Sequence, residues 1–314
     1  MALPPLDDDR LHVLVFGPGI GELVLVRAPP DSWLVIDGCS SDGEPYGQRV
    51  LEHYKATPKA IVFTHPHLDH ARGVADVVDA ATTDSRETWP RLGMLPILQH
   101  LVERPTGGRD PAADFERGVT EQAVAAILDR WERHPPCRWD VGFGAEELLG
   151  EARIKVISPA PMVADRAEQK LLAAKRFDWN TVSTALLLEW RGRRILLGSD
   201  LVEQPLQGWS RAARLWWDEL SRFDAAKVPH HGSARALDRN LLTGPAVGIV
   251  TPFATKGLPR FDAGEGLEQL ISRRFRIFLT GLPRAHSAQA GSPMQLSRAA
   301  FAPDPLIRCV FHST

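Results

Sequence analysis

A short segment of the chain, residues 64–70, concentrates the residue types that bind metal ions. Its sequence is Thr-His-Pro-His-Leu-Asp-His, so three imidazoles and one carboxylate follow one another closely. Neutral imidazole and carboxylate suit borderline divalent ions such as zinc. The apolar run Ala60–Phe63 precedes the segment and is typical of a buried strand. We therefore predict a metal site at a strand end, in preference to a surface loop that is rich in histidine by chance.

The spacing of these ligands predicts two ions. His65 and His67 are two residues apart in extended chain, so both side chains can point to one side and share an ion. Asp69 and His70 are expected in the first turn of a following helix, where they would face a second ion. Two ions about 3.5–4 Å apart form the arrangement that activates water for an in-line displacement.

Two later segments supply further ligand types. Residues 193–199 read as an apolar strand that ends at Asp200, whose carboxylate could bridge two cations. Residues 228–233 end another short strand with the adjacent imidazoles of His230 and His231. Neighbouring residues of a strand point in opposite directions, so one of the two histidines is expected to face the site. Asp200 alone would be an ordinary strand-end residue, and the three segments together support the metal site.

A predicted hairpin brings a polar segment next to Asp200. Residues 182–190 and 193–199 read as two strands joined by a turn. Because Asp200 lies eight residues after the turn glycine, Gly192, pairing places residues 180–183 beside Asp200. The arginines of the turn would lie roughly 20 Å away, at about 3.3 Å per residue, and are expected to be solvated.

Four stretches of the chain carry a resemblance to a known superfamily. They are the glycine turn at 16–22 with the strand at 33–38, the histidine segment at 64–70, the hairpin at 180–200, and residues 227–233. The chain resembles metallo-β-lactamase-fold hydrolases. Within that superfamily it is most similar to the hydrolase domain of ComEC-type DNA-uptake proteins and their soluble relatives.

This resemblance implies an α/β fold, an αββα four-layer sandwich with a dinuclear centre of zinc or manganese at one edge of the sheets. By position, the resemblance implies that His65 and His67 bind the first metal and that Asp69 and His70 bind the second. Asp200 would bridge the two metals, and His230 or His231 would complete the second site. Asp37 would orient the histidine segment from behind. On sequence alone, an ordinary strand-end aspartate explains Asp37 equally well.

Three features depart from the superfamily pattern. Many members supply a further histidine to the first metal, and none occurs near Asn180, so water or Asn180 could serve there instead. Glu22 stands where the subgroup usually has aspartate. The late His-Pro signature is replaced by Leu-Pro-Arg-Phe at residues 258–261, a difference that bears on substrate contacts.

Bulk properties predict one domain. A chain of 314 residues with 44% hydrophobic content can bury a full core, and we expect a single domain over residues 1–314. A mostly helical insertion is predicted at residues 82–150, either as a lid or specificity element or as a packing layer. The formal charge of −2 argues against gripping long nucleic acid by charge alone.

The expected location is the cytoplasm. Three cysteines, an odd number, argue against a disulfide framework and favour a reducing compartment. The acidic start has no apolar core, so a signal peptide is not expected. No apolar window is long enough for a membrane span, and a freestanding protein without the ComEC membrane channel is expected.

The predicted function is metal-dependent hydrolysis, most specifically as a phosphodiesterase or nuclease-like enzyme on single-stranded nucleic acid or a nucleotide. Asp69 and Asp200 would orient the attacking water and accept its proton, and Asn180 or Ser183 would donate a hydrogen bond to a substrate oxygen. Two alternatives stay open: an accessory or sensing subunit with a vestigial metal site, and hydrolysis of a thioester, lactone or β-lactam. The sequence identifies no protein partner.

Tryptophans offer a weaker indication of the substrate. Eight of the nine lie between Trp89 and Trp217. Aromatic platforms beside a phosphodiester site can stack bases, and Trp179, Trp209 and Trp217 are the candidates. Most tryptophans serve instead as core residues.

Overall fold

Two facing sheets form the centre of the molecule. The structure is a computed structural model that describes residues 3–17, 21–41, 44–82, 89–103, 111–237, 246–253, 256–260, 262, 264–281, 299–301 and 306–311. Residues 18–20 of the glycine turn and Phe261 lie outside the described residues. Within the described part of the chain, no helix is both long enough and apolar enough to cross a lipid bilayer.

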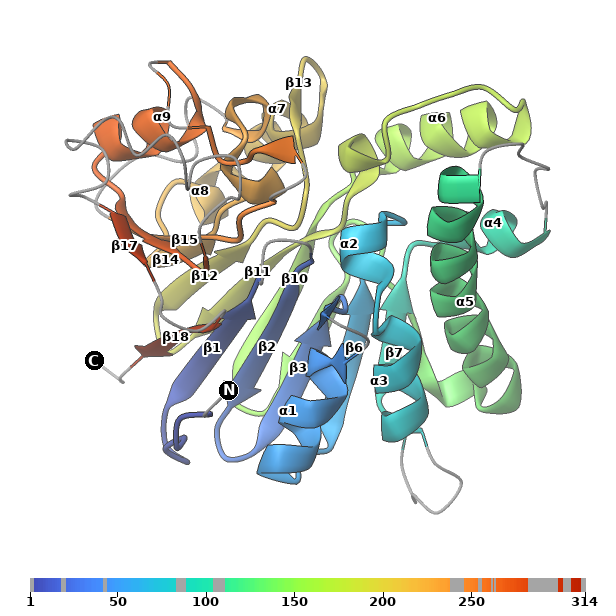
Figure 1. Ribbon diagram of the computed structural model, residues 1–314, viewed down its shortest axis with the longest axis horizontal. Coiled ribbons are helices and arrows are strands. Elements are labelled where there is room, and N and C mark those ends of the chain that lie inside the picture. Colours follow the sequence, from blue (N-terminus) through green and yellow to red (C-terminus); the bar gives the residue numbers. More distant parts are fainter. Residues whose placement is uncertain are drawn as a thin grey trace.

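The first sheet has the strand order β18-β1-β2-β3-β6-β7-β8 among the described residues (Figure 1). Its strands β1, β2 and β3 are rich in valine and leucine and buried along nearly their whole length, because both faces of the sheet are covered. The bounds are β1 (Leu11–Phe16), β2 (Leu23–Ala28), β3 (Ser32–Ile36), β6 (Pro58–Phe63), β7 (Arg91–Met94), β8 (Arg138–Asp140) and β18 (Leu306–Phe311).

The second sheet has the order β17-β16-β15-β14-β12-β11-β10-β9 among the described residues. Its bounds are β9 (Glu146–Leu149), β10 (Ala152–Ser158), β11 (Ala185–Trp190), β12 (Arg193–Leu197), β14 (Ala225–Lys227), β15 (Val247–Val250), β16 (Arg276–Leu279) and β17 (Ala299–Phe301). Short strands outside the two sheets are β4 (Ser40–Ser41), β5 (Glu44–Pro45) and β13 (Glu203–Gln204).

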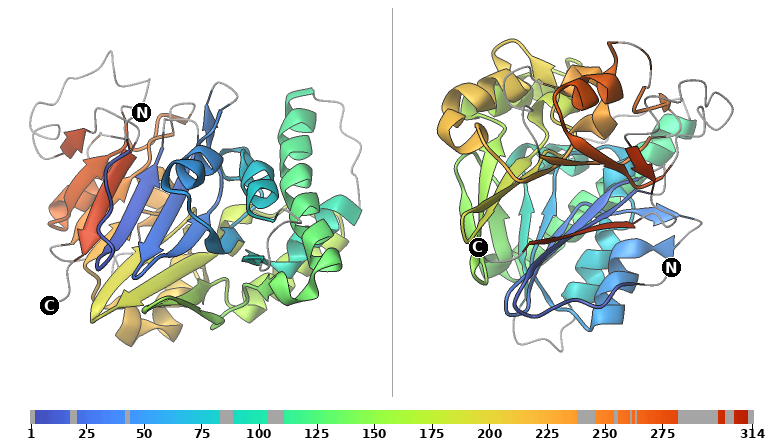
Figure 2. Two further views of the ribbon diagram at one scale, coloured as in Figure 1. Left: turned by 90° about the horizontal axis from the view of Figure 1, so that it is seen from below. Right: turned by 90° about the vertical axis from the view of Figure 1, so that its left-hand side faces the viewer.

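Helices cover both outer faces (Figure 2). The α-helices are α1 (Tyr46–Tyr54), α2 (Leu68–Ala71), α3 (Val74–Ala81), α4 (His100–Glu103), α5 (Pro111–Arg133), α6 (Pro161–Leu172), α7 (Gly208–Leu215), α8 (Trp217–Leu220) and α9 (Gly266–Ser272). The 3-10 helices are η1 (Pro96–Gln99), η2 (Pro135–Cys137), η3 (Trp179–Val182), η4 (His230–Gly232) and η5 (Ala234–Ala236).

Alternation along β11 shows the layers directly. Leu186 and Leu188 belong to the core between the two sheets, whereas Leu187 packs with Trp209 of α7 on the outer face. Successive side chains of a strand point to opposite faces, so one strand contributes to two apolar layers. The predicted αββα sandwich is confirmed.

The segment at residues 82–150 is more closely integrated than the predicted insertion. Helices α4 and α5 lie within it, as predicted, but β7 and β8 extend the first sheet and β9 ends the second. Helical residues outnumber strand residues in the segment, as predicted, but the prediction did not include these three strands. Their short lengths explain the miss, since a strand of three or four residues has almost no periodic signal.

The hairpin of β11 and β12 has the predicted register. Leu186 pairs with Leu197 and Trp190 pairs with Arg193, and continuing this register places Ser183 opposite Asp200. The backbone N–H of Asp200 donates to Oγ of Ser183 at 3.2 Å. The arginines of the turn lie at the other end and form ion pairs there, for example Arg193 with Asp224 at 2.7 Å.

Candidate metal centre

The histidine segment begins where β6 ends. Asp37, directly after β3, accepts hydrogen bonds from the backbone N–H of Thr64 at 2.8 Å and from its hydroxyl at 2.7 Å. Because β3 and β6 are parallel neighbours, their carboxyl ends meet at one edge of the first sheet. Asp37 therefore fixes the start of the segment that carries the candidate ligands.

The helix predicted to follow Asp69 is divided in two. Helix α2 ends at Ala71, and α3 begins at Val74 after Gly73, which adopts the left-handed conformation with φ 82°. The backbone N–H of Gly38 donates to the carbonyl of His70 at 2.8 Å, which ties this short helix to the end of β3.

One group of candidate ligands contains His65, His67 and Asp200. Their nearest ligand atoms all lie within 4.8 Å of one another. Nε2 of His65 lies 3.0 Å from Nδ1 of His67 and 3.9 Å from Oδ2 of Asp200. His65 and Asp200 are buried, and His67 is half-buried, so His67 is the accessible member of this group.

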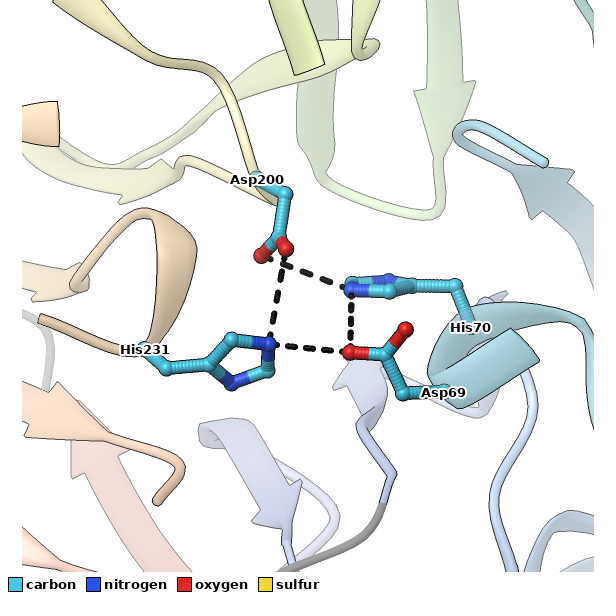
Figure 3. A group of neighbouring side chains, drawn as sticks. All are labelled: Asp69, His70, Asp200 and His231. Carbon is cyan, nitrogen blue, oxygen red and sulfur yellow. Dashed lines mark hydrogen bonds and ion pairs between the residues drawn. The ribbon is translucent and has the colours of Figure 1, made fainter. Parts of the chain in front are cut away.

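A second group contains Asp69, His70, Asp200 and His231, which all point toward one another (Figure 3). Nε2 of His231 lies 3.0 Å from Oδ2 of Asp69 and 3.4 Å from Oδ2 of Asp200. Nε2 of His70 lies 3.4 Å from Oδ1 of Asp200. All four residues are buried. Asp200 belongs to both groups and lies between them, at the position predicted for a bridging carboxylate.

Three histidines are oriented by a hydrogen bond on the side away from the cluster. Nδ1 of His70 lies 2.6 Å from Oδ2 of Asp37, Nδ1 of His231 lies 2.8 Å from the carbonyl of Thr251, and Nδ1 of His65 lies 3.1 Å from Oγ1 of Thr64. Each ring therefore presents Nε2 to the cluster. This is the pattern by which outer hydrogen bonds fix the tautomer and orientation of metal-binding histidines.

The charges of the cluster suit added cations. Four carboxylates, those of Glu22, Asp37, Asp69 and Asp200, are each at most 7% exposed, and Lys227 is the buried lysine beside them. Buried charges are stable only when they are paired. When the imidazoles are neutral, the four carboxylates and the one lysine carry a net charge of −3. Two divalent ions can balance this charge.

Two buried atoms without hydrogen-bond partners in the described part of the chain also indicate a metal site. Among the described residues, Nε2 of His70 and Oδ1 of Asp200 are buried without a hydrogen-bond partner. Buried polar atoms without partners are rare in folded proteins and call for an explanation such as an ion. The donor set, imidazole nitrogen with carboxylate oxygen, fits a divalent metal of the zinc or manganese type. The fold and this cluster together suggest a dinuclear metal site.

Without metal, protons take the place of the cations. Burial favours the neutral imidazole, but the carboxylates of Asp200 and Asp69 outweigh it and raise the pKa of His231 to about 10. Against the same effect of burial, Asp200, Asp37 and Asp69 hold the pKa of His70 well above its usual range. His65 behaves in the opposite way, because burial and the neighbouring His70 and His67 lower its pKa well below the usual value.

The structure separates the roles of the two adjacent histidines. His231 points into the second group, whereas Nε2 of His230 lies 3.4 Å from Nδ2 of Asn180. Both residues have left-handed backbone conformations, with φ 47° and 54°, so the alternation rule for extended strands does not apply to them. Of the two predicted candidates for the second group, the geometry therefore favours His231.

The two predicted substrate contacts lie in different surroundings. Asn180 is 7% exposed, and its Oδ1 has no partner among the described residues. Ser183 is fully buried, and its hydroxyl donates to Oγ of Ser199 at 2.9 Å while it accepts from the backbone of Asp200. The position of Ser183 thus contradicts a direct contact with substrate and supports a role in positioning Asp200.

Sequence reasoning missed a buried ion pair behind the cluster. Lys227 pairs with Glu22, and its Nζ donates to the carbonyl of Ser199 at 3.0 Å and lies 3.9 Å from Oδ1 of Asp200. The hydroxyl of Thr251 donates to Glu22 at 2.6 Å. The available signal was a lysine at the end of the short strand β14, three residues before His230.

The candidate tryptophans differ in their surroundings. Trp209 is 1% exposed and donates its Nε1–H to the carbonyl of Leu201, so the prediction that it stacks bases is wrong. Trp217 is exposed on α8. Trp179 is half-buried and lines a cavity together with His67.

The chain matches a known family model and is similar to several solved structures. Residues 16–155 match the family model described as the metallo-beta-lactamase superfamily. No curated protein matches the chain. Among solved structures, the chain is similar to CmlA, a diiron beta-hydroxylase from Streptomyces venezuelae, with 12% identity, a TM-score of 0.44, and coverage of 98% of this chain and 55% of that chain.

Two further solved structures are similar over their whole length. One is a diphosphatase from the PhnP family, with 10% identity, a TM-score of 0.46, and coverage of 96% of this chain and 98% of that chain. The other is the metallo-beta-lactamase fold protein YhfI from Bacillus subtilis, with 11% identity, a TM-score of 0.45, and coverage of 96% and 100%. The matched family model and the two facing sheets with outer helices show that the chain has the fold of the metallo-beta-lactamase superfamily.

Proposed function

We propose that the protein is a metal-dependent hydrolase with a dinuclear centre, and that its substrate is a phosphodiester. The observation that carries the proposal is the position of Asp200, which is buried and shared by two groups of ligand atoms. A single carboxylate between two sets of imidazole and carboxylate donors is the arrangement expected for a bridging ligand.

The residues proposed to hold the two ions follow from these groups. His65, His67 and Asp200 would hold the first ion, and Asp69, His70, Asp200 and His231 would hold the second. A pair of divalent ions lowers the pKa of water and stabilises negative charge on a substrate oxygen. Zinc or manganese is the proposed metal, because both accept mixed nitrogen and oxygen donors.

The side chains of the chain itself would orient the reactants. Asp69 and Asp200 present carboxylate oxygens at the shared centre, where they can orient the attacking water and accept its proton. Asn180 lies beside His230, and its amide can donate a hydrogen bond to a substrate oxygen. Ser183 and Lys227 contact Asp200 from behind and would keep its carboxylate in place.

The choice of a phosphodiester rests on the resemblance to ComEC-type hydrolase domains that residues 16–22, 33–38, 64–70, 180–200 and 227–233 carry. The net charge of −2 favours a nucleotide or a short single strand over long nucleic acid, because affinity for long nucleic acid depends on many cationic contacts.

The test combines metal content with turnover. Purified protein loaded with zinc or manganese should contain two ions per chain by elemental analysis and should hydrolyse bis-p-nitrophenyl phosphate. Asp200→Ala should lose turnover and at least one ion, because it removes the shared ligand. Asp76→Ala, which removes an exposed aspartate of α3, is the matched control and should retain both.

Two outcomes would contradict the proposal. Turnover by Asp200→Ala at the level of the unmodified protein would remove Asp200 from the site. Absence of both turnover and metal in the unmodified protein would favour the alternative of an accessory or sensing subunit. Circular dichroism of each variant separates these results from a loss of folding.

A further inference from the structure

A cavity adjoins the first ligand group on the side of the helical segment. Its volume is ≈ 460 Å³, and His67 contributes to its lining. Residues of α4, α5 and the end of α6 form its walls, together with Trp179. Figure 1 shows α4, α5 and α6 gathered on the side of the molecule next to α2. The cavity therefore opens beside a residue proposed to hold the first ion.

The wall of the cavity combines a planar ring with aliphatic side chains. Trp179 is half-buried and packs against Phe177, with ring centroids 4.4 Å apart, so its position is fixed. Leu68, Leu101 and Leu171 contribute apolar surface around it. An indole held in this way offers a stacking surface for a planar group, and such stacking tolerates any base.

Cations also line the cavity. Lys175 and Arg176 follow α6, are exposed, and line the cavity. Neither forms an ion pair with a residue that the structure describes. Arg117 also lines the cavity, but it pairs with Glu121 at 3.5 Å. Adjacent lysine and arginine side chains bind phosphate oxygens through charge-assisted hydrogen bonds.

We propose that this cavity binds one arm of a nucleotide-like substrate. The cavity lies between Trp179, the exposed pair Lys175 and Arg176, and His67. A planar base stacks on the indole of Trp179, and the two cations hold a phosphate. The inference rests on the proposed phosphodiesterase function and names the part of the substrate that lies beyond the scissile bond. The helical segment then determines specificity.

The size of the cavity sets the length of this arm. Sites for single small ligands measure about 300–1,000 Å³, and ≈ 460 Å³ falls at the lower end of that range. One nucleotide unit fits such a volume, whereas a folded or double-stranded nucleic acid does not. The ligand class is therefore a mononucleotide ester or the end of a single strand.

Binding measurements test the site without requiring turnover. Calorimetric titration of the metal-loaded protein with thymidine 5′-monophosphate should give an affinity about tenfold or more above that of methyl phosphate, because stacking adds to the phosphate contacts. Methyl phosphate carries the same anion without the base. Equal affinities for the two ligands would overturn the inference.

Variants locate the binding in the cavity. Leu172→Glu, at a cavity residue that is 43% exposed, and the double variant Lys175→Ala with Arg176→Ala should each weaken binding of thymidine 5′-monophosphate about tenfold. The matched control, Arg166→Ala with Lys170→Ala, removes two exposed cations of α6 that do not line the cavity and should change affinity less than twofold. Trp179→Leu should weaken binding in the same way, and Trp217→Leu, at an exposed tryptophan that does not line the cavity, is its matched control. Pocket variants that bind like their controls would overturn the inference.

Turnover distinguishes this inference from the proposed function. The p-nitrophenyl ester of thymidine 5′-monophosphate should be hydrolysed with a higher kcat/KM than methyl p-nitrophenyl phosphate. Trp179→Leu and Leu172→Glu should remove that difference, because the ester carries the stacking base but no phosphate besides the scissile one. Turnover of both esters without a preference contradicts the cavity site and leaves the hydrolase intact. A binding preference without turnover of any ester supports the cavity site and contradicts the hydrolase.

Discussion

At the residue scale, the candidate centre depends on the side chains that orient its ligand residues as much as on the ligand residues themselves. Asp37 contacts both Thr64 and His70 and is 1% exposed. It therefore fixes the start of the histidine segment and the orientation of one imidazole at the same time. Outer partners of this kind typically contribute 10–100-fold to metal affinity.

Asp37→Asn should lower metal affinity by about 10–100-fold, because an amide of the same shape is a weaker acceptor for the Nδ1–H of His70. Competition with a chromogenic chelator measures this affinity. Asp31→Asn, which changes an exposed aspartate that pairs with Arg27, should leave the affinity unchanged. An unaltered affinity in Asp37→Asn would show that His70 does not depend on this contact.

Metal affinity should rise with pH. The pKa of His231 in the metal-free protein is raised to about 10, so the ring carries a proton throughout the range from pH 6.5 to pH 9. A metal ion needs the neutral ring and must displace that proton. Up to tenfold tighter binding per pH unit is expected for each proton displaced. Calorimetry in buffers of different ionisation enthalpy should detect proton release on binding, and pH-independent binding without release would contradict the assignment.

The two ligand groups of the candidate site could be predicted from the sequence, except for the choice between two adjacent histidines. The dense segment at 64–70 and the hairpin register that brings Ser183 to Asp200 depend on local spacing. The choice between His230 and His231 depends on left-handed backbone angles that spacing does not encode. The pairing of Glu22 with Lys227 joins residues far apart in the chain, and only tertiary packing reveals it.

At the element scale, the turn that carries His231 is supported by α9. A Cβ atom on Gly266, the first residue of α9, would lie 1.6 Å from the carbonyl oxygen of Gly232. The helix and the histidine turn therefore pack in direct backbone contact. The position of the second ligand group therefore depends on α9, although α9 supplies no ligand.

Gly266→Ala should displace the histidine turn and weaken metal binding about tenfold or more, although it changes no ligand and leaves the fold of the sheets in place. Chelator competition measures the affinity, and circular dichroism checks the fold. Gly118→Ala on α5 is the matched control, since a Cβ there meets nothing within 4 Å, and it should bind metal normally. Normal binding by Gly266→Ala would show that the turn does not need this packing.

Long elements could be predicted better than short ones. The apolar run at residues 60–63 lies within β6, and the two strands predicted for the hairpin, at 182–190 and 193–199, contain β11 and β12. Their apolar runs and periodicity are strong because they face a large core. The break at Gly73 and the strands β7, β8 and β9 were missed, because tertiary contacts stabilise these short pieces more than their own sequence does.

At the scale of the whole molecule, the candidate centre joins the two sheets. His65 to His70 follow β6 of the first sheet, whereas Asp200 and His231 follow β12 and β14 of the second. Ions bound by both sets would hold the two halves of the sandwich together at this edge. Binding to the folded state alone stabilises a protein by about 2.7 kcal/mol when the free ligand is at 100 times its dissociation constant.

Removal of metal should therefore lower the midpoint of thermal unfolding. A decrease of about 3–8 °C is expected on treatment with a chelator, from that stabilisation and the usual relation between free energy and Tm. Differential scanning fluorimetry with and without zinc measures it. Asp200→Ala should show a much smaller change, and an equal response in that variant would indicate that the stabilising ions bind elsewhere.

The most direct measurement of the dinuclear centre is anomalous diffraction from a crystal grown with zinc or manganese. We expect two peaks on opposite sides of the carboxylate of Asp200, one in contact with His65 and His67 and the other with Asp69, His70 and His231. A single peak, or peaks that do not contact Asp200, would contradict a centre shared between the two sheets.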